Sequence, residues 1–116
     1  MNESGFRRGD IVVYAVAGDF GKPRPALLIQ SDLFNETHPS AVVCPITSEL
    51  TGLTLFRVRL DPSPASGLKK ESEVMVDKMT AASRTRIKQR IGRLTRSQMA
   101  MIERCLRMWL ELPQDA

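Results

Sequence analysis

Short apolar segments separated by turn-forming residues make up most of this chain of 116 residues. Segments of this kind, bounded by Gly, Pro, Ser, Asn or Asp, are typical of buried strands in a small β protein. The least regular of them follows a short helical turn that we expect near residues 83–87. The sequence predicts strands at residues 11–16, 25–30, 41–47, 55–60, 73–79 and 89–94.

Two of these segments also indicate how they sit in a sheet. Every second residue from Phe56 to Leu60 is apolar, while Arg57 and Arg59 lie on the opposite face. This alternation is typical of a half-buried antiparallel strand. Pro45 has no N–H to donate to a neighbouring strand, so its position indicates a sheet edge or a bulge.

The end of the chain predicts a helix over residues 96–110, because its apolar residues recur at helical spacing. Thr95 and Gln98 fit a capping box, in which each side chain binds a free backbone N–H at the helix start. The apolar stripe is wider than the ~100° of a helix packed on one surface. Either the helix covers a sheet and also contacts a second subunit, or it packs into one deep core. The stripe consists of Met99, Met101, Ile102, Cys105, Leu106, Met108, Trp109 and Leu110.

Together these elements predict a mainly β protein, a small and strongly curved barrel with a C-terminal helix packed against it. The length suits a single domain, residues 1–116, whose core needs neither metal nor disulfide. No run approaches the ~20 apolar residues that span a bilayer. The N-terminus has no apolar signal core. We therefore expect a cytoplasmic protein without a membrane partner.

Positive charge is concentrated at the end of the chain. Residues 1–80 carry nine Lys and Arg against ten Asp and Glu, whereas residues 81–116 carry eight against three. Such a basic excess attracts a polyphosphate or an acidic protein, and the charge alone does not choose between them. A basic face that contacts only solvent would show the same excess of Lys and Arg.

Several kinds of chemistry do not fit this sequence. The seven glycines are scattered and form no phosphate-cradling loop. His38 is the only histidine, and its surroundings are those of a loop residue. Cys44 and Cys105 lie among apolar neighbours, which indicates buried thiols and no structural zinc site. The acidic residues are dispersed. We expect neither a metal nor an organic cofactor.

An arginine and a hydroxyl remain as candidates. Arg24 lies between Pro23 and Pro25 at the mouth of a strand, where proline stiffens the backbone on both sides. Thr47 closes the next strand, and the two side chains converge if these strands are neighbours. A guanidinium and a hydroxyl hold a phosphate and stabilise developing charge. This chemistry suits RNA, which supplies its own 2′-OH nucleophile. The alternatives are a solvated arginine and a simple strand-end hydroxyl.

The order of short motifs along the chain resembles the MazF/PemK family of toxin endoribonucleases. The motifs are Arg8-Gly9-Asp10-Ile11-Val12, Gly21-Lys22-Pro23-Arg24-Pro25-Ala26-Leu27, Pro45-Ile46-Thr47-Ser48, Ser72 to Thr80, and Ile91-Gly92-Arg93-Leu94. The resemblance covers roughly residues 7–110. It implies an SH3-like barrel of five to seven strands, a homodimer, sequence-specific cleavage of single-stranded RNA at short sequences, and inhibition by a cognate antitoxin with an acidic tail.

The resemblance also implies catalytic roles. The arginine of the Arg-Pro-Ala motif is Arg24, as general acid and phosphate stabiliser, and the threonine of the Pro-x-Thr motif is Thr47, which stabilises the transition state. Some relatives use an acidic residue of the later strand as base, and it matches Asp77. Those relatives carry an arginine two positions earlier, where this chain has Met75.

By the same resemblance we assign RNA binding to a second set of residues. Asp19, Phe20 and Lys22 belong to the loop before Arg24, which gates the groove in the family. Phe20 either stacks on a base or anchors its own loop. Ser48 and Lys78 adjoin the matched catalytic positions.

Two other functions compete with the nuclease. A related fold poisons DNA gyrase by binding protein, and fold alone does not assign function. An inactive relic that binds only RNA or antitoxin is the third possibility. Arg24 and Thr47 favour the nuclease over both.

Overall fold

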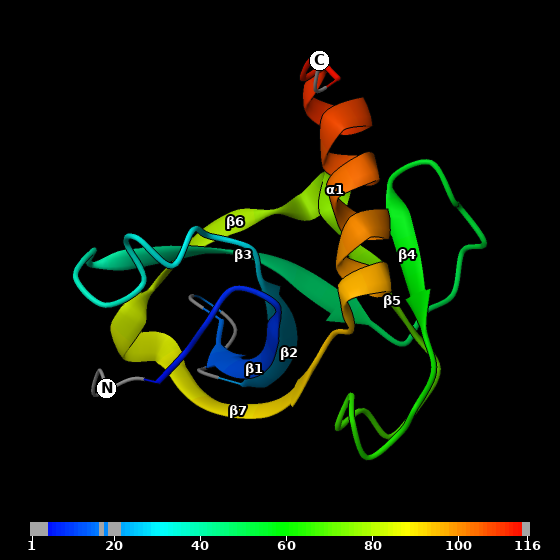
Figure 1. Ribbon diagram of the computed structural model, residues 1–116. Coiled ribbons are helices and arrows are strands. Elements are labelled where there is room, and N and C mark those ends of the chain that lie inside the picture. Colours follow the sequence, from blue (N-terminus) through cyan, green and yellow to red (C-terminus); the bar gives the residue numbers. More distant parts are fainter. Residues whose placement is uncertain (1–4, 17, 19–21, 115–116) are drawn as a thin grey trace.

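The computed structural model describes residues 5–16, 18 and 22–114. Its strands form one antiparallel sheet in the order β4-β5-β3-β2-β1-β7, and β6 pairs with β3 beside this path. Figure 1 shows the sheet curling into a barrel around β1 and β2, with α1 beside β4. The elements are β1 Asp10–Ala15, β2 Pro23–Leu28, β3 Ser40–Thr47, β4 Arg57–Leu60, β5 Ser72–Met75, η1 Val76–Lys78, β6 Thr80–Ser83, η2 Arg84–Arg86, β7 Ile87–Arg93 and α1 Arg96–Leu110.

The sequence-based prediction of a curved barrel with a C-terminal helix is confirmed, with two corrections. The strand expected at 73–79 is broken: β5 ends at Met75, and the single 3-10 turn η1 redirects the chain into β6. The second strand begins two residues earlier than expected, so Arg24 lies within β2 and not in a loop. Prolines are tolerated there because β3 pairs with β2 only from Ala26 onward, which leaves residues 23–25 at an edge on that side.

Both faces of the central strands are buried, which explains why the sequences of these strands are nearly continuous apolar runs. One core lies between the sheet and α1 and includes Ile11, Leu27 and Cys44. The other fills the barrel and includes Val12 and Val43. Successive residues of β1 therefore point into different cores, and a shift of one residue in its register would exchange them.

Strand β3 changes partner along its length. Its Ser40–Val43 half pairs with β6, and Ile46 and Thr47 pair with β5. Neither β5 nor β6 pairs with Pro45. The proline thus occupies the position where a missing N–H costs least, which agrees with the expected local edge.

Helix α1 begins at the expected capping box. The N–H of Gln98 donates to Thr95 Oγ1 (3.1 Å), and the N–H of Thr95 donates to Gln98 Oε1 (2.8 Å). Only Ile102 and Cys105 of the helix are buried. Met101, Met108, Trp109 and Leu110 are about half exposed in the chain, with exposed fractions of 48–60%. The wide apolar stripe therefore covers the core with one part and leaves the rest at the surface.

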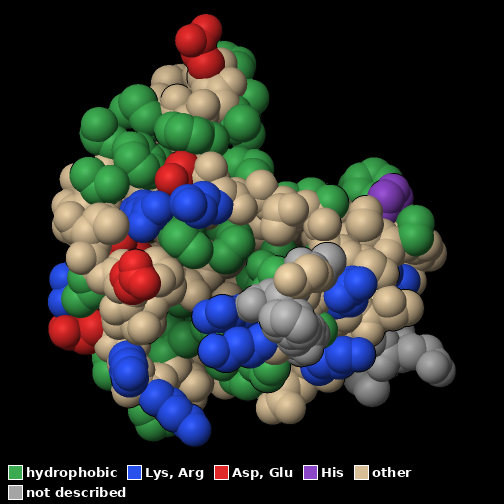
Figure 2. Space-filling view, turned by 180° about the vertical axis from the view of Figure 1, so that it is seen from behind, with side chains coloured by type: hydrophobic (Ala, Val, Ile, Leu, Met, Phe, Trp, Pro, Cys, Tyr) green, Lys and Arg blue, Asp and Glu red, His purple; other side chains and the backbone are tan. Residues whose placement is uncertain are grey.

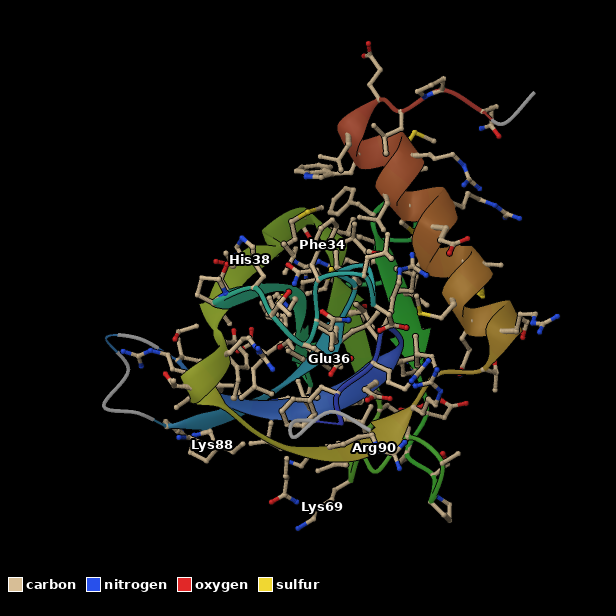
Figure 3. The ribbon with its side chains drawn as sticks, turned by 60° about the vertical axis from the view of Figure 1, so that its left-hand side comes forward. Phe34, Glu36, His38, Lys69, Lys88 and Arg90 are labelled. Carbon is tan, nitrogen blue, oxygen red and sulfur yellow. The ribbon has the colours of Figure 1, made fainter. Side chains whose placement is uncertain are left out.

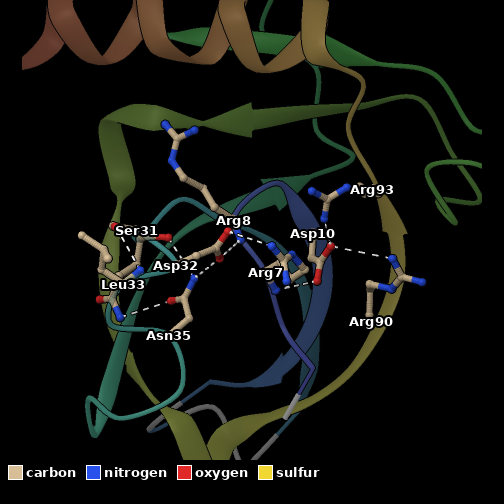
Figure 4. Close-up of polar contacts among 10 residues, drawn as sticks. Arg7, Arg8, Asp10, Ser31, Asp32, Leu33, Asn35, Arg90 and Arg93 are labelled. Atoms are coloured by element: carbon tan, nitrogen blue, oxygen red, sulfur yellow. Dashed lines mark hydrogen bonds and ion pairs between the residues drawn. The ribbon is translucent and has the colours of Figure 1, made fainter. Parts of the chain in front are cut away.

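A buried aspartate ties the start of β1 to β7. Asp10 is 1% exposed and accepts a hydrogen bond from the N–H of Arg7 (2.8 Å). Its carboxylate also pairs with Arg93 and, at 3.8 Å, with Arg90 (Figure 4). The Gly9-Asp10 motif is thus a structural device that fastens two neighbouring strands.

A second buried ion cluster corrects the interpretation of β4. Arg57 was expected on the polar face with Arg59, but its side chain is only 10% exposed. Its guanidinium pairs with Glu73 (3.5 Å) and, through two hydrogen bonds, with Asp77 (3.1 and 3.3 Å). These contacts raise the pKa of Arg57 further above its ordinary value, mainly through the hydrogen bonds to Asp77. Arg57, Asp77 and the buried Glu73 therefore form one ion cluster, in which no side chain is more than 14% exposed.

No helix among the described residues is long and apolar enough to cross a membrane.

Removing Arg57 should destabilise the fold strongly. Arg57→Ala leaves Glu73 and Asp77 as buried carboxylates without their cation, and breaking a buried pair in this way costs about 3–5 kcal/mol. The matched control is Arg59→Ala on the same strand, because Arg59 forms only an exposed pair with Glu71 and should change stability by about 0–1 kcal/mol. Urea denaturation followed by circular dichroism measures both. Equal midpoints for the two variants would contradict the assignment.

Candidate functional site

A hollow of about 490 Å³ opens at the end of the barrel where β2 begins and β3 ends. Arg24 and Thr47 both line it. Extended strands supply its walls, and the connection between β4 and β5 supplies its rim. The other lining residues are Tyr14, Val16, Pro25, Pro45, Ile46, Ser48, Glu49, Leu68, Lys69, Lys70, Ser72 and Met75.

Strand register explains why Arg24 and Thr47 meet. Ala26 pairs with Pro45 across β2 and β3. Continuing this antiparallel register by two residues places Thr47 opposite Arg24, on the same face of the sheet. The expected neighbourhood of the two strands is confirmed.

The hydroxyl of Thr47 is oriented by its own turn. The N–H of Glu49 donates to Thr47 Oγ1 at 3.0 Å. Because Oγ1 accepts this bond, the hydroxyl proton is left to donate to an anion in the hollow.

Glu73 of β5 lies opposite Thr47 in the register of β3 and β5. Its carboxylate accepts from the N–H groups of Thr51 and Gly52 (both 2.9 Å) and from the Thr51 hydroxyl (2.9 Å). Burial by itself would raise the pKa of Glu73, but these hydrogen bonds and Arg57 outweigh it and hold that pKa below its usual range. Glu73 thus stays charged and anchors the loop that follows Thr47.

Tyr14 forms the back of the hollow and pairs with Arg24 across β1 and β2. Tyr14 is 6% exposed. Burial raises the pKa of the Tyr14 phenol, and the positive charge of Arg24 opposes part of that rise. The positive charge of Arg24 therefore acts on the phenol of Tyr14, and both residues line the hollow.

Lys69 and Lys70 add positive charge at the rim. Sequence analysis missed them, although two adjacent lysines in a Pro/Ser/Gly loop were a signal of charge. Figure 2 shows Lys and Arg side chains gathered on the lower part of the face turned toward the viewer. In Figure 3, Lys69 projects on the same side of the molecule as Lys88 and Arg90 of β7. The hollow thus combines cations and hydroxyls, the groups that bind phosphate.

The cysteines and the histidine lie elsewhere. Cys44 is fully buried, and burial raises the pKa of its thiol to about 12, so it is no activated nucleophile. His38 lies in the loop between β2 and β3, where its Nδ1 lies 3.2 Å from the N–H of Ser40. No cluster of three or more potential metal ligands of the His, Cys, Asp or Glu type occurs in the described part of the chain.

Residues 7–110 match the sequence profile of the PemK-like, MazF-like toxins of type II toxin–antitoxin systems. The chain belongs to this family. A probable endoribonuclease MazF of Mycolicibacterium smegmatis is 43% identical over 105 residues, which cover 90% of this chain and 95% of that protein. The endoribonuclease EndoA of Bacillus subtilis is 26% identical over 111 residues, covering 91% and 95%.

Solved structures of the family share the fold. The Mycobacterium tuberculosis toxin MazF-mt6 superposes with a TM-score of 0.79 at 23% identity, over 90% of this chain and 99% of that one. The MazE–MazF structure (Form II) of Deinococcus radiodurans gives 0.77 at 24% identity, over 93% and 97%. An endoribonuclease from a mycobacterial species, solved with its cognate antitoxin, gives 0.80 at 20% identity, over 96% and 100%.

The structure brings together only some of the residues matched to MazF/PemK motifs. Arg24, Thr47 and Ser48 line one hollow. Lys22 is exposed just before β2, and Lys78 is exposed in η1 without lining the hollow. Asp19 and Phe20 lie outside the described residues.

Asp77 is placed away from the other matched residues. It does not line the hollow, and both of its oxygens accept hydrogen bonds from Arg57. Met75, where some relatives have an arginine, does line the hollow and pairs with Arg57 across β4 and β5. The arginine that binds Asp77 in this chain is therefore Arg57 of the neighbouring strand β4, and not a residue two positions before Asp77.

Titration of Tyr14 tests the geometry of the hollow directly, because Tyr14 is the only tyrosine in the chain. Arg24 lowers the Tyr14 pKa by stabilising the phenolate. Arg24→Ala should therefore move the midpoint of the ultraviolet phenolate titration to higher pH. The control Arg104→Ala removes an equal charge from α1, away from the hollow, and should leave the midpoint unchanged. Circular dichroism confirms that each variant stays folded. A midpoint that stays in place in Arg24→Ala would contradict the proximity.

Proposed function

We propose that this chain is the toxin of a toxin–antitoxin pair and cleaves single-stranded RNA at the hollow that contains Arg24 and Thr47. The observation that carries the proposal is the opposed placement of these two residues in a basic hollow. Membership of the MazF/PemK family and the 43% identity to a protein named as a probable endoribonuclease support it. The described geometry offers nothing in favour of a gyrase-binding toxin.

The reaction follows from the groups at the hollow. The 2′-oxygen of the substrate attacks the adjacent phosphorus, a new 2′-O–P bond forms, and the bond to the 5′-oxygen of the next nucleotide breaks. The planar fork of Arg24 and the Thr47 hydroxyl stabilise the charge that develops on the phosphate oxygens. Arg24 also protonates the departing 5′-oxygen. The products are a 2′,3′-cyclic phosphate and a 5′-OH end.

Glu49 takes the role of the base that accepts the 2′-OH proton. Among the described residues it is the one carboxylate that lines the hollow, and its own N–H binds the Thr47 hydroxyl oxygen. Asp77 is occupied by Arg57 in the second buried ion cluster. In this proposal Asp77 stabilises the fold, and Glu49 accepts the proton in the chemical step.

Two partners complete the proposal. The apolar side chains that α1 leaves exposed give a second copy of the chain a surface to bury, because monomers rarely expose such patches. Sedimentation at micromolar concentration tests the dimer. The cognate antitoxin is the second partner, as in the structures solved for relatives, and its acidic tail suits the basic hollow.

The function is tested with a long single-stranded RNA whose cut sites are mapped by primer extension. Cleavage should leave a 2′,3′-cyclic phosphate, or the 3′-phosphate that it hydrolyses to, and should proceed in EDTA. An oligonucleotide with one 2′-deoxy substitution at the cleavage position should bind and resist cutting, because it lacks the nucleophile. Cutting of this substrate, or a requirement for added magnesium, would point to metal-activated water. A supercoiling assay with DNA gyrase separates the protein-binding toxin.

Loss of either matched residue should abolish activity in a folded protein. Arg24→Ala and Thr47→Ala each remove a donor to the transition state, which costs about 100- to 1,000-fold in rate. Arg24→Lys should also be slow, since an ammonium does not reproduce the planar fork. Single-turnover cleavage and growth inhibition measure the effect. Full activity of a folded Arg24→Ala protein would refute the assignment.

The two carboxylates are distinguished by a matched pair of variants. Glu49→Gln should lower the rate by about 100- to 10,000-fold, as expected for a lost general base, and should leave the denaturation midpoint unchanged. Asp77→Asn should keep the cleavage rate and lower the denaturation midpoint, because it weakens an ion pair that is largely buried. A loss of cleavage rate in a folded Asp77→Asn variant, with the rate kept in Glu49→Gln, would assign the role of the base to Asp77 instead.

A further inference from the structure

One matched motif, Ile91-Gly92-Arg93-Leu94, has no part in the proposed reaction. Gly92 lies in β7, and its φ is not in the left-handed region. The position therefore needs no glycine for its backbone conformation. It needs a glycine for space, because the Cβ of any other residue would lie 2.1 Å from the backbone oxygen of Ser66 and 2.2 Å from its carbonyl carbon.

A second glycine makes the same contact from the other side. Gly67 has a φ of +70°, and a Cβ there would lie 1.9 Å from the backbone oxygen of Ile91. The N–H of Arg93 also donates to the carbonyl oxygen of Ala65 at 2.9 Å. We call this contact of residues 65–67 with residues 91–93 the glycine crossing. Even a weak C–H···O contact needs about 3.3 Å between carbon and oxygen, so an added Cβ must move one backbone from the other by roughly 1 Å.

The loop that crosses β7 is held together by one buried hydroxyl. Ser66 is 6% exposed, and its Oγ donates to the carbonyl oxygen of Asp61 (3.1 Å). The same oxygen accepts from the N–H groups of Ser63 and Leu68 (both 3.2 Å). Several points of the loop are therefore tied to Ser66, and a displacement at the glycine crossing is passed to the whole loop.

Two lysines connect this loop to the hollow that contains Arg24 and Thr47. Leu68 directly follows the glycine crossing, is buried and lines the hollow, and Lys69 and Lys70 come next at the rim. On the other side, the Ser72 hydroxyl at the start of β5 donates to the carbonyl oxygen of Lys70 (2.8 Å). The backbone of both lysines is thus held between two fixed points, while their side chains are exposed.

We propose that Gly92 is a positioning residue for RNA binding, which through the glycine crossing holds Lys69 and Lys70 where they bind substrate phosphates other than the one that reacts. The inference rests on the proposed ribonuclease function and adds a residue that acts before the chemical step. Gly92 itself does not line the hollow. A lysine is a point charge on a flexible stem, so the placement of its backbone decides which phosphates it reaches. Such contacts fix affinity and register without reading sequence.

The test measures binding of the full chain to single-stranded DNA, which has the phosphates of RNA and lacks the 2′-OH nucleophile. Replacing both lysines by alanine should weaken binding about tenfold. It should also lower the slope of log affinity against log salt by about 1.4, at about 0.7 for each phosphate contact on a single strand. Gly92→Ala should give a comparable loss, because it displaces the loop that carries the lysines. In the Gly92→Ala background, the lysine replacements should then change affinity by less than about twofold, since both changes act through one contact.

Two further variants separate positioning from a general loss of stability. Ile102→Val removes one methyl group from the core beneath α1, which lowers the denaturation midpoint, and it should leave affinity and salt slope unchanged. Ser66→Ala removes the hydroxyl that ties the loop together and adds no atom at β7, so it tests the proposal even where Gly92→Ala does not fold. Its loss of affinity should likewise disappear once both lysines are replaced.

Cleavage of RNA gives an independent readout. Gly92→Ala should raise KM about tenfold and keep kcat, because the lysines bind phosphates other than the one that reacts. A loss of kcat with an unchanged KM would overturn the proposal, since the glycine crossing would then act on the chemical step.

Other outcomes decide between this inference and the proposed function. Additive losses from Gly92→Ala and the lysine replacements, an unchanged salt slope in a folded Gly92→Ala variant, or an equal loss in Ile102→Val would each overturn the positioning role. If the unmodified chain cuts no RNA but the coupling measured on DNA holds, the ribonuclease proposal fails and the positioning role stands. If the chain cuts RNA and both lysines can be replaced without effect, the positioning role fails alone. A chain that binds neither DNA nor RNA would overturn both.

Discussion

Strands β2 and β3 pair through Ala26–Leu28 and Val43–Pro45, and side chains on both faces of this ladder are buried. One face belongs to the barrel interior and the other to the core beneath α1. A slip of one residue would exchange the faces, so the register is fixed by two cores at once. The same register, continued past the ladder, sets Thr47 opposite Arg24. The geometry of the site therefore depends on a ladder whose two faces are both buried.

Buried charge divides the acidic residues into two groups. Asp10, Glu73 and Asp77 are held by arginines or by backbone N–H groups and serve the fold. Glu49 is exposed at the hollow. A carboxylate that is fully bound in the folded state is a poor acceptor for a substrate proton, because taking the proton would break its ion pair. Position in the structure thus separates groups that look alike in the sequence.

Preorganisation links this scaffold to the proposed chemistry. Pro23 and Pro25 restrict the backbone around Arg24, the Glu49 N–H orients the Thr47 hydroxyl, and Glu73 holds the loop that follows. Groups fixed before the substrate arrives need no reorganisation when charge develops on the phosphate.

The sequence by itself determined the element types, the bounds of α1 with its capping box, the burial of the cysteines and the two motif residues at the hollow. These are local properties, set by apolar period, proline and short-range hydrogen bonds. Tertiary structure decided the rest. The turn at 76–78, the burial of Arg57 and the removal of Asp77 from the hollow depend on contacts between β4, β5 and η1. Lys69, Lys70 and Glu49 join the hollow because strand pairing brings distant loops to one end of the barrel. Such pairing is non-local, and no spacing along the chain encodes which loop meets which.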